Sequence, residues 1–144
     1  MSEHHFEVLL VEDDPGDVVM TQEAFVDGGL NGTLHVTRDG IEAMEFLRNA
    51  EEPRPDLVLL DLNLPRMAGH EVLAAIRADD ALTQLPVVVL TTSSAQDDVE
   101  RSYRLHANAY VTKPTDALAL AEAVRAIDEL FTTVARRPPE HAGG

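Results

Sequence analysis

Residues 57–65 read LVLLDLNLP, a continuous apolar run that stops at Asp61 and is followed by Pro65. Four apolar residues without alternation are typical of a strand buried on both faces, as in a parallel sheet. Two similar runs occur at residues 8–11 (VLLV) and 87–90 (VVVL), and weaker strand patterns occur at 33–36 and 109–111. The sequence therefore predicts five strands, of which residues 8–11, 57–60 and 87–90 have the strongest patterns.

Segments with helical spacing separate these strands. Asp14 and Pro15 have the residue types of a helix N-cap and a first helical residue, so a helix is predicted from there to about Asp27. The pair Gly28-Gly29 is expected to end it. Because strands and helices alternate, the fold class is α/β, a doubly wound five-stranded parallel sheet. The other predicted helices span residues 40–50, 69–79, 95–106 and 115–134.

The composition limits the class of protein. The 144 residues include 26 Asp+Glu against 11 Lys+Arg, which gives a net charge of −15, and there is no Cys. Such a surface repels nucleic-acid phosphates, and the lack of Cys excludes disulfides, thiolate metal sites and a cysteine nucleophile. No apolar run approaches the ~20 residues that cross a membrane. We therefore expect a cytoplasmic domain over residues 1–135, a disordered tail over 136–144, and neither nucleic acid nor membrane as a partner.

Polar residues follow four of the predicted strands, in the positions where sheets of this class bind ligands. The first strand is followed by Glu12 and Asp13, and the run 57–60 by Asp61. Three crowded carboxylates repel one another unless a cation joins them, and Mg²⁺ prefers such oxygen ligands. One carboxylate could then attack phosphorus, with the hydroxyl of Thr91 and the ammonium of Lys113 as donors to the developing charge.

Lys113 is the only lysine in the chain, which contains ten arginines. The chain therefore uses arginine wherever a surface cation is needed. A compact ammonium differs from a planar guanidinium when the target is a single phosphoryl oxygen. This contrast favours a specific role for Lys113 over a leftover surface charge.

Four motifs resemble those of the receiver domains of two-component response regulators. They are residues 11–14 (VEDD), 60–67 (LDLNLPRM), 90–92 (LTT) and 110–114 (YVTKP), and they match in register from about Phe6 to Val134. The resemblance implies a flavodoxin-like (βα)5 fold with strand order 2-1-3-4-5. It also implies a single-domain response regulator, not an enzyme beyond its own phosphotransfer and slow autodephosphorylation. The phosphoryl group would come from a sensor histidine kinase in a Mg²⁺-dependent reaction.

The same resemblance assigns the residues of the phosphorylation site. Asp61 would be the phosphoacceptor. Glu12, Asp13 and Asp61 would hold Mg²⁺, together with the backbone carbonyl of Asn63. These roles are expectations carried over by position.

The remaining motif positions would read and transmit the phosphorylation. Thr91 would be the switch hydroxyl, Lys113 the phosphate-contacting lysine and Tyr110 the aromatic switch residue. Pro114 would follow a cis peptide bond. The stretch 91–110 further resembles small regulators that partner phytochrome-type histidine kinases, which suggests a bacteriophytochrome-type kinase as the partner.

Two other functions are compatible with parts of the pattern. An aspartyl phosphatase would place a second Asp two residues after the nucleophile, where this chain has Asn63, which cannot transfer a proton. A flavodoxin-like cofactor binder would need a Gly-, Ser- or Thr-rich phosphate cradle after the first strand. The acidic residues 12–14 would repel a phosphate there unless a metal intervened.

We expect the output of such a domain to leave through a protein surface, because the segment that follows Val134 is too short for a DNA-binding module. The predicted helix 95–106 is strongly charged, and its expected core anchors are only Val99 and Tyr103. Weakly anchored elements are those that shift between states. We therefore expect the face made by this helix, the 109–111 strand and the final helix to respond to phosphorylation and to support a homodimer.

Overall fold

The computed structural model describes residues 5–27 and 32–130, and in them the predicted fold is confirmed. Every pair of neighbouring strands is parallel, and the sheet order is β2-β1-β3-β4-β5. The strands are β1 (Phe6–Val11), β2 (Gly32–Thr37), β3 (Leu57–Leu60), β4 (Val87–Thr91) and β5 (Ala109–Thr112).

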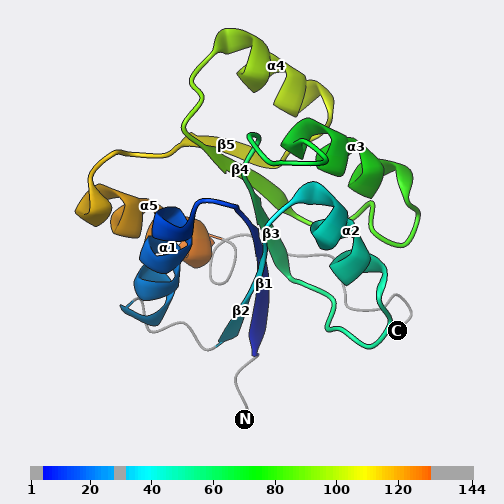
Figure 1. The fold of residues 1–144 in the computed structure, drawn as a ribbon, viewed down its shortest axis with the longest axis horizontal. Helices are drawn as coiled ribbons and strands as arrows, with labels where there is room; N and C mark the ends of the chain where they lie inside the picture. Colours follow the sequence, from blue (N-terminus) through cyan, green and yellow to red (C-terminus); the bar gives the residue numbers. More distant parts are fainter. Residues whose placement is uncertain (1–4, 28–31, 131–144) are drawn as a thin grey trace.

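Helices cover both faces of the sheet (Figure 1). One face carries α1 (Pro15–Asp27) and α5 (Ala117–Glu129), which pack side by side. The other carries α2 (Gly40–Arg48) and α3 (Gly69–Ala78), while α4 (Gln96–Arg104) lies next to α3 and β5. Among the helices of the described residues, none has the length and apolar character that a membrane crossing requires.

The double coverage explains why the strands are continuously apolar. In β1, Val8 and Leu10 pack in a core with Phe25 of α1, whereas Leu9 and Val11 pack in the opposite core. Both sets are buried, so neither face of the strand tolerates a polar residue. Each such side chain contributes about 1.5–3 kcal/mol relative to an exposed one.

The N-terminus of α1 follows the predicted capping pattern. The helix begins at Pro15, Asp14 Oδ2 accepts a hydrogen bond from the backbone N–H of Asp17 at 3.1 Å, and Asp14 O accepts one from Val18 N at 3.0 Å. The predicted glycine stop at 28–29 lies outside the described residues, as do the end of the predicted 115–134 helix and the 136–144 tail.

The strand register brings the polar strand ends together at one edge. Val11 pairs with Leu60, and the N–H of Asp61 donates to Val11 O at 3.1 Å. On the next strands Thr91 pairs with Thr112, and Lys113 N donates to Thr91 O at 2.6 Å. The edge therefore carries the residues that follow β1, β3, β4 and β5 in adjacent positions.

Candidate functional site

Three carboxylates gather at this edge. Glu12, Asp13 and Asp61 each offer an oxygen, and these three oxygens lie within 4.8 Å of one another. Glu12 is 3% exposed and Asp61 is 6% exposed, whereas Asp13 faces solvent. Burial raises the pKa of Glu12 to about 7; the hydrogen bond from Lys113 opposes this shift, and the charge of Asp61 adds to it. The cluster therefore has the donor chemistry of a divalent-cation site.

The single lysine reaches this cluster from β5. Lys113 Nζ donates to Glu12 Oε1 at 2.5 Å and lies 3.6 Å from Asp61 Oδ2. Its side chain is 4% exposed. Burial alone would lower the pKa of Lys113, but hydrogen bonds to Asp17 and Glu12 and the charge of Asp61 outweigh it and raise the pKa. The ammonium is therefore charged and held beside the predicted phosphoacceptor.

Asp17 is a partner of Lys113 that the sequence motifs do not predict. Its Oδ2 accepts a hydrogen bond from Lys113 Nζ at 2.6 Å, nearly as short as the 2.5 Å bond to Glu12. The signal available in the sequence was its position in the first turn of the helix that follows the acidic strand end. First-turn residues of such helices lie at the same edge as the strand ends, so Asp17 belongs to the group.

Thr91 and Tyr110 lie on neighbouring strands beside the cluster. Thr91 is completely buried, and its hydroxyl oxygen is 3.5 Å from the backbone N of Ser93. The Tyr110 hydroxyl donates to the carbonyl of Ser93 at 2.7 Å, and burial raises the pKa of this phenol. Ser93 in turn donates from Oγ to Asp98 Oδ2 at 2.6 Å. The loop after Thr91 is thus tied to β5 on one side and to α4 on the other.

Asn63 lies on the loop that leaves the predicted phosphoacceptor, and its N–H is 3.3 Å from Asp61 Oδ1. Further along this loop Arg66 has a left-handed backbone with φ 67°, and its guanidinium binds Asp39 with two hydrogen bonds, of 3.0 and 3.1 Å. Asp39 also caps α2 by accepting a hydrogen bond from the N–H of Glu42. This hydrogen bond lowers the pKa of the Asp39 carboxyl, and Arg66 lowers it further.

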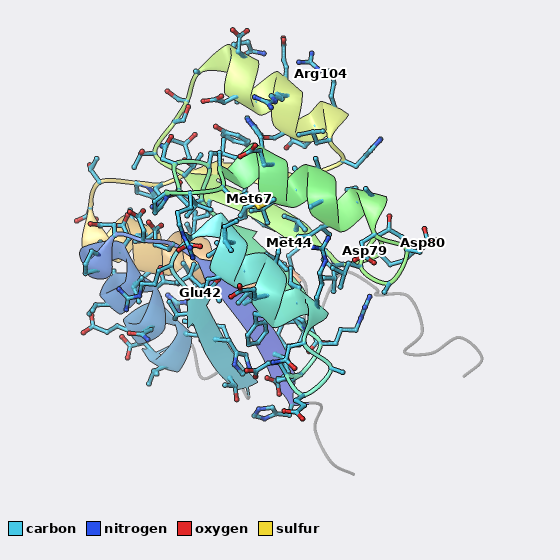
Figure 2. All side chains as sticks on the ribbon, turned by 45° about the vertical axis from the view of Figure 1, so that its right-hand side comes forward. Glu42, Met44, Met67, Asp79, Asp80 and Arg104 are labelled. Atoms are coloured by element: carbon cyan, nitrogen blue, oxygen red, sulfur yellow. The ribbon has the colours of Figure 1, made fainter. Side chains whose placement is uncertain are left out.

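Close packing fixes the same loop at both ends. A Cβ at Gly40 would collide with the backbone of Met67, and one at Gly69 would collide with the carbonyl of Asp61. Met67 also packs against the core that contains Met44 of α2. In Figure 2 Met44 is labelled below Met67. The loop after Asp61 is therefore held against α2 and α3.

The prediction of a cis peptide bond before Pro114 is wrong. Within residues 5–27 and 32–130 every peptide bond is trans. The trans form of an X–Pro bond is favoured by about 0.5–1 kcal/mol unless neighbouring contacts select the cis form. Here Lys113 makes its backbone bond to Thr91 and its side-chain bonds to Glu12 and Asp17 with the trans bond in place.

The expected anchoring of α4 needs a correction as well. Val99 is half-buried as expected, but Tyr103 is 50% exposed, and the buried residue of this helix is Ser102. Helical periodicity places residues 98, 99 and 102 on one face of α4. Tyr103 follows Ser102 and is therefore rotated by about 100° from it around the helix axis. Arg104, the last residue of α4, is also exposed (Figure 2).

A buried polar pair links α4 to α3 in place of the aromatic anchor. Ser102 Oγ donates a hydrogen bond to the carbonyl of Asp98 at 2.8 Å, and His70 Nε2 lies 3.0 Å from Ser102 Oγ. Because a hydroxyl has one proton, the ring nitrogen of His70 must be the donor to Ser102. Burial lowers the pKa of His70, with the charge of Arg101 adding to the shift, so the ring is neutral with its proton on Nε2.

Comparison with known proteins agrees with this geometry. Residues 8–125 match the model of the response regulator receiver domain. Response regulator Rcp1 of Synechocystis sp. is 43% identical over 91% of this chain and 92% of its own length. The crystal structure of the phosphorylated cyanobacterial phytochrome response regulator RcpA superposes with a TM-score of 0.91 at 43% identity, covering 94% of this chain and 100% of that one.

One of the similar solved structures is described with a metal. The Mn²⁺-bound form of response regulator Rcp1 matches with a TM-score of 0.87 at 41% identity, over 93% of this chain and 99% of the other. The family model, the relatives and the sheet order agree with one another. The chain belongs to the response regulator receiver domain family, and it is a signalling protein of that family.

Proposed function

We propose that this protein accepts a phosphoryl group on the side chain of Asp61 from a sensor histidine kinase. The observation that carries the proposal is the position of Asp61, a buried carboxylate within reach of two further carboxylates and of the only lysine in the chain. Charge at a transferred phosphoryl group must be neutralised as it develops, and this edge of the sheet gathers the groups that can do so.

The transfer is a displacement at phosphorus. An Oδ atom of Asp61 forms the new P–O bond while the P–N bond of a phosphohistidine breaks, and the electron pair stays with the imidazole, which takes up a proton. Lys113 donates an N–H to one phosphoryl oxygen, and the Thr91 hydroxyl, at the end of the adjacent strand, donates to another. Both donors are buried at the edge of the sheet.

The proposed cofactor is Mg²⁺, held by Glu12, Asp13, Asp61 and the backbone carbonyl of Asn63. The three carboxylates provide the oxygen ligands that a hard cation prefers, and the Mn²⁺ in the structure of Rcp1 supports a divalent metal here. When bound, the ion would neutralise charge on the phosphoryl oxygens.

The partner is proposed to be a phytochrome-type histidine kinase, because the similar protein RcpA is described as a cyanobacterial phytochrome response regulator and another similar structure as a bacteriophytochrome response regulator. A cytoplasmic location and a homodimer through α4, β5 and α5 are further parts of this proposal. Domain limits of 1–135 with a tail at 136–144 also remain a proposal.

The proposed function is tested with a small-molecule phosphodonor. Wild-type protein incubated with acetyl phosphate and Mg²⁺ should gain the mass of one phosphoryl group, which is lost at alkaline pH as expected of an acyl phosphate. EDTA should prevent the gain, and Asp61→Asn should remain unlabelled in Mg²⁺. Labelling of Asp61→Asn at the wild-type level would contradict the proposal, and so would a wild type that takes no label.

Thr91→Ala should separate acceptance of the phosphoryl group from its transmission. The nucleophile and the metal ligands remain, so Asp61 should still be labelled. The variant lacks the hydroxyl that would draw the 91–93 loop toward the phosphoryl group, so α4 should respond less. Hydrogen exchange of α4 amides, with and without acetyl phosphate, measures this response. A wild-type response in labelled Thr91→Ala would show that this hydroxyl does not carry the signal.

A further inference from the structure

Asp17 has no part in the proposed metal site, yet it makes one of the shortest contacts of the buried ammonium. Its Oδ2 lies 2.6 Å from Lys113 Nζ, and its side chain is 21% exposed against 4% for the lysine. Among the described residues, the carboxylates that could hold a metal together are those of Glu12, Asp13 and Asp61. Asp17 is therefore a fourth carboxylate, and it contacts the Lys113 ammonium and not the carboxylates of the other three acids.

The backbone of Asp17 is fixed from two sides. Its N–H donates to Asp14 Oδ2 at 3.1 Å, and its carbonyl accepts from the Thr21 hydroxyl at 2.8 Å. Thr21 is itself a buried residue of α1. The carboxylate therefore projects from a rigid first helical turn, and it can hold the end of a long flexible side chain in one place.

The three acids near the ammonium are at unequal distances. Glu12 and Asp17 receive direct hydrogen bonds of 2.5 and 2.6 Å, whereas the Asp61 oxygen is 3.6 Å away, beyond hydrogen-bonding distance. A lysine ammonium has three N–H donors and a flexible stem, so without Asp17 it could move to Asp61. The observed geometry leaves the Asp61 carboxylate without a direct bond from the cation.

We propose that Asp17 is a positioning residue for phosphotransfer, one that holds Lys113 back from Asp61 until a phosphoryl group arrives. This inference rests on the proposed function. A carboxylate tied directly to an ammonium is a weaker nucleophile and a poorer metal ligand than a free one. By keeping Lys113 on Glu12 and itself, Asp17 leaves Asp61 free to attack, while the ammonium stays near enough to bond a phosphoryl oxygen once transfer begins.

The test compares three variants with the wild type. Asp17→Asn keeps the shape and removes the charge, and Asp17→Glu restores the charge on a longer side chain. Glu23→Gln is the matched control, because Glu23 is an exposed acid on the same helix and its change removes the same charge. The first readout is spectroscopic: with lysine-selective ¹⁵N labelling, the only lysine gives a single ammonium signal.

The ammonium signal should shift in metal-free Asp17→Asn, return toward the wild-type position in Asp17→Glu, and stay unchanged in Glu23→Gln. The second readout is the rate of labelling by acetyl phosphate in Mg²⁺. We expect about a tenfold loss for Asp17→Asn, which corresponds to about 1.4 kcal/mol in the barrier. The lifetime of the phosphoaspartate should change less than about twofold, since Lys113 bonds the phosphoryl group in both proteins.

Each alternative outcome is decisive. A wild-type labelling rate or an unshifted ammonium signal in Asp17→Asn would overturn the positioning role. So would an equal loss in Glu23→Gln, which would assign the effect to net charge, or an equal loss in phosphoaspartate lifetime, which would assign it to general disorder of the site. All of these leave the proposed function intact. A wild type that takes no label would instead overturn the proposed function, and this inference with it.

Discussion

Replacing Lys113 by Met should lower the free energy of unfolding by about 3–5 kcal/mol, the cost of removing one partner from a buried ion pair. The ammonium lies within 3.6 Å of carboxylate oxygens of Glu12, Asp17 and Asp61. Without it, these acids face one another with no cation among them. Urea unfolding in EDTA measures the loss.

Two variants control for charge and for the kind of cation. Arg104→Met removes a positive charge from an exposed site, so its effect should stay within about 0.5 kcal/mol. Lys113→Arg retains the charge, but its planar fork is too bulky for contact with one oxygen, so both stability and labelling rate should fall below the wild type. Wild-type behaviour of Lys113→Arg would show that any cation serves here.

Mg²⁺ should stabilise the wild type in a concentration-dependent way, by about 2.7 kcal/mol at a hundredfold excess over the dissociation constant. Asp61→Asn should stabilise the metal-free protein by about 1 kcal/mol and respond weakly to Mg²⁺. Two unit charges ~5 Å apart repel by roughly 3 kcal/mol at an effective dielectric of ~20. Screening, and the lost attraction between Asp61 and Lys113 at 3.6 Å, reduce the gain. Thermal melts at pH 8 with EDTA and with Mg²⁺ provide the comparison.

The same melts have a predictable pH dependence. Glu12 has a pKa of about 7 in the folded protein against 4.5 ordinarily, so the folded state binds this proton more tightly than the unfolded chain. In EDTA the wild type should therefore gain stability as the pH falls from 8 through 7, and the benefit of Asp61→Asn should shrink. If Asp61→Asn were destabilising in EDTA and Mg²⁺ had no effect on the wild type, the acidic residues would be separate structural groups.

The strands and the edge they form could be predicted because burial on both faces leaves a direct mark on the sequence. The run 57–60 coincides with β3, and the acidic residues after β1 and β3 meet because parallel strands in register end together. The start of α1 at Pro15 followed from local capping chemistry alone. These features depend on neighbours in the sequence or on a single periodicity.

Contacts between distant side chains were harder to predict. Asp17 and Lys113 are 96 residues apart, and only the packing of α1 against the sheet edge shows that they meet. The exposure of Tyr103 and the burial of Ser102 depend on the rotation of α4, which the bond to His70 fixes. The isomer of the bond before Pro114 likewise follows from tertiary contacts, which the sequence does not reveal.

The residue that carries the phosphoryl group can be identified chemically. Borohydride reduces an aspartyl phosphate to homoserine, which peptide mass spectrometry locates in the chain. After treatment of the wild type with acetyl phosphate and Mg²⁺, we expect homoserine at position 61, and none when EDTA replaces the metal. Homoserine at position 13, 14 or 17, or at no position of a labelled protein, would contradict the assignment of Asp61 as the phosphoacceptor.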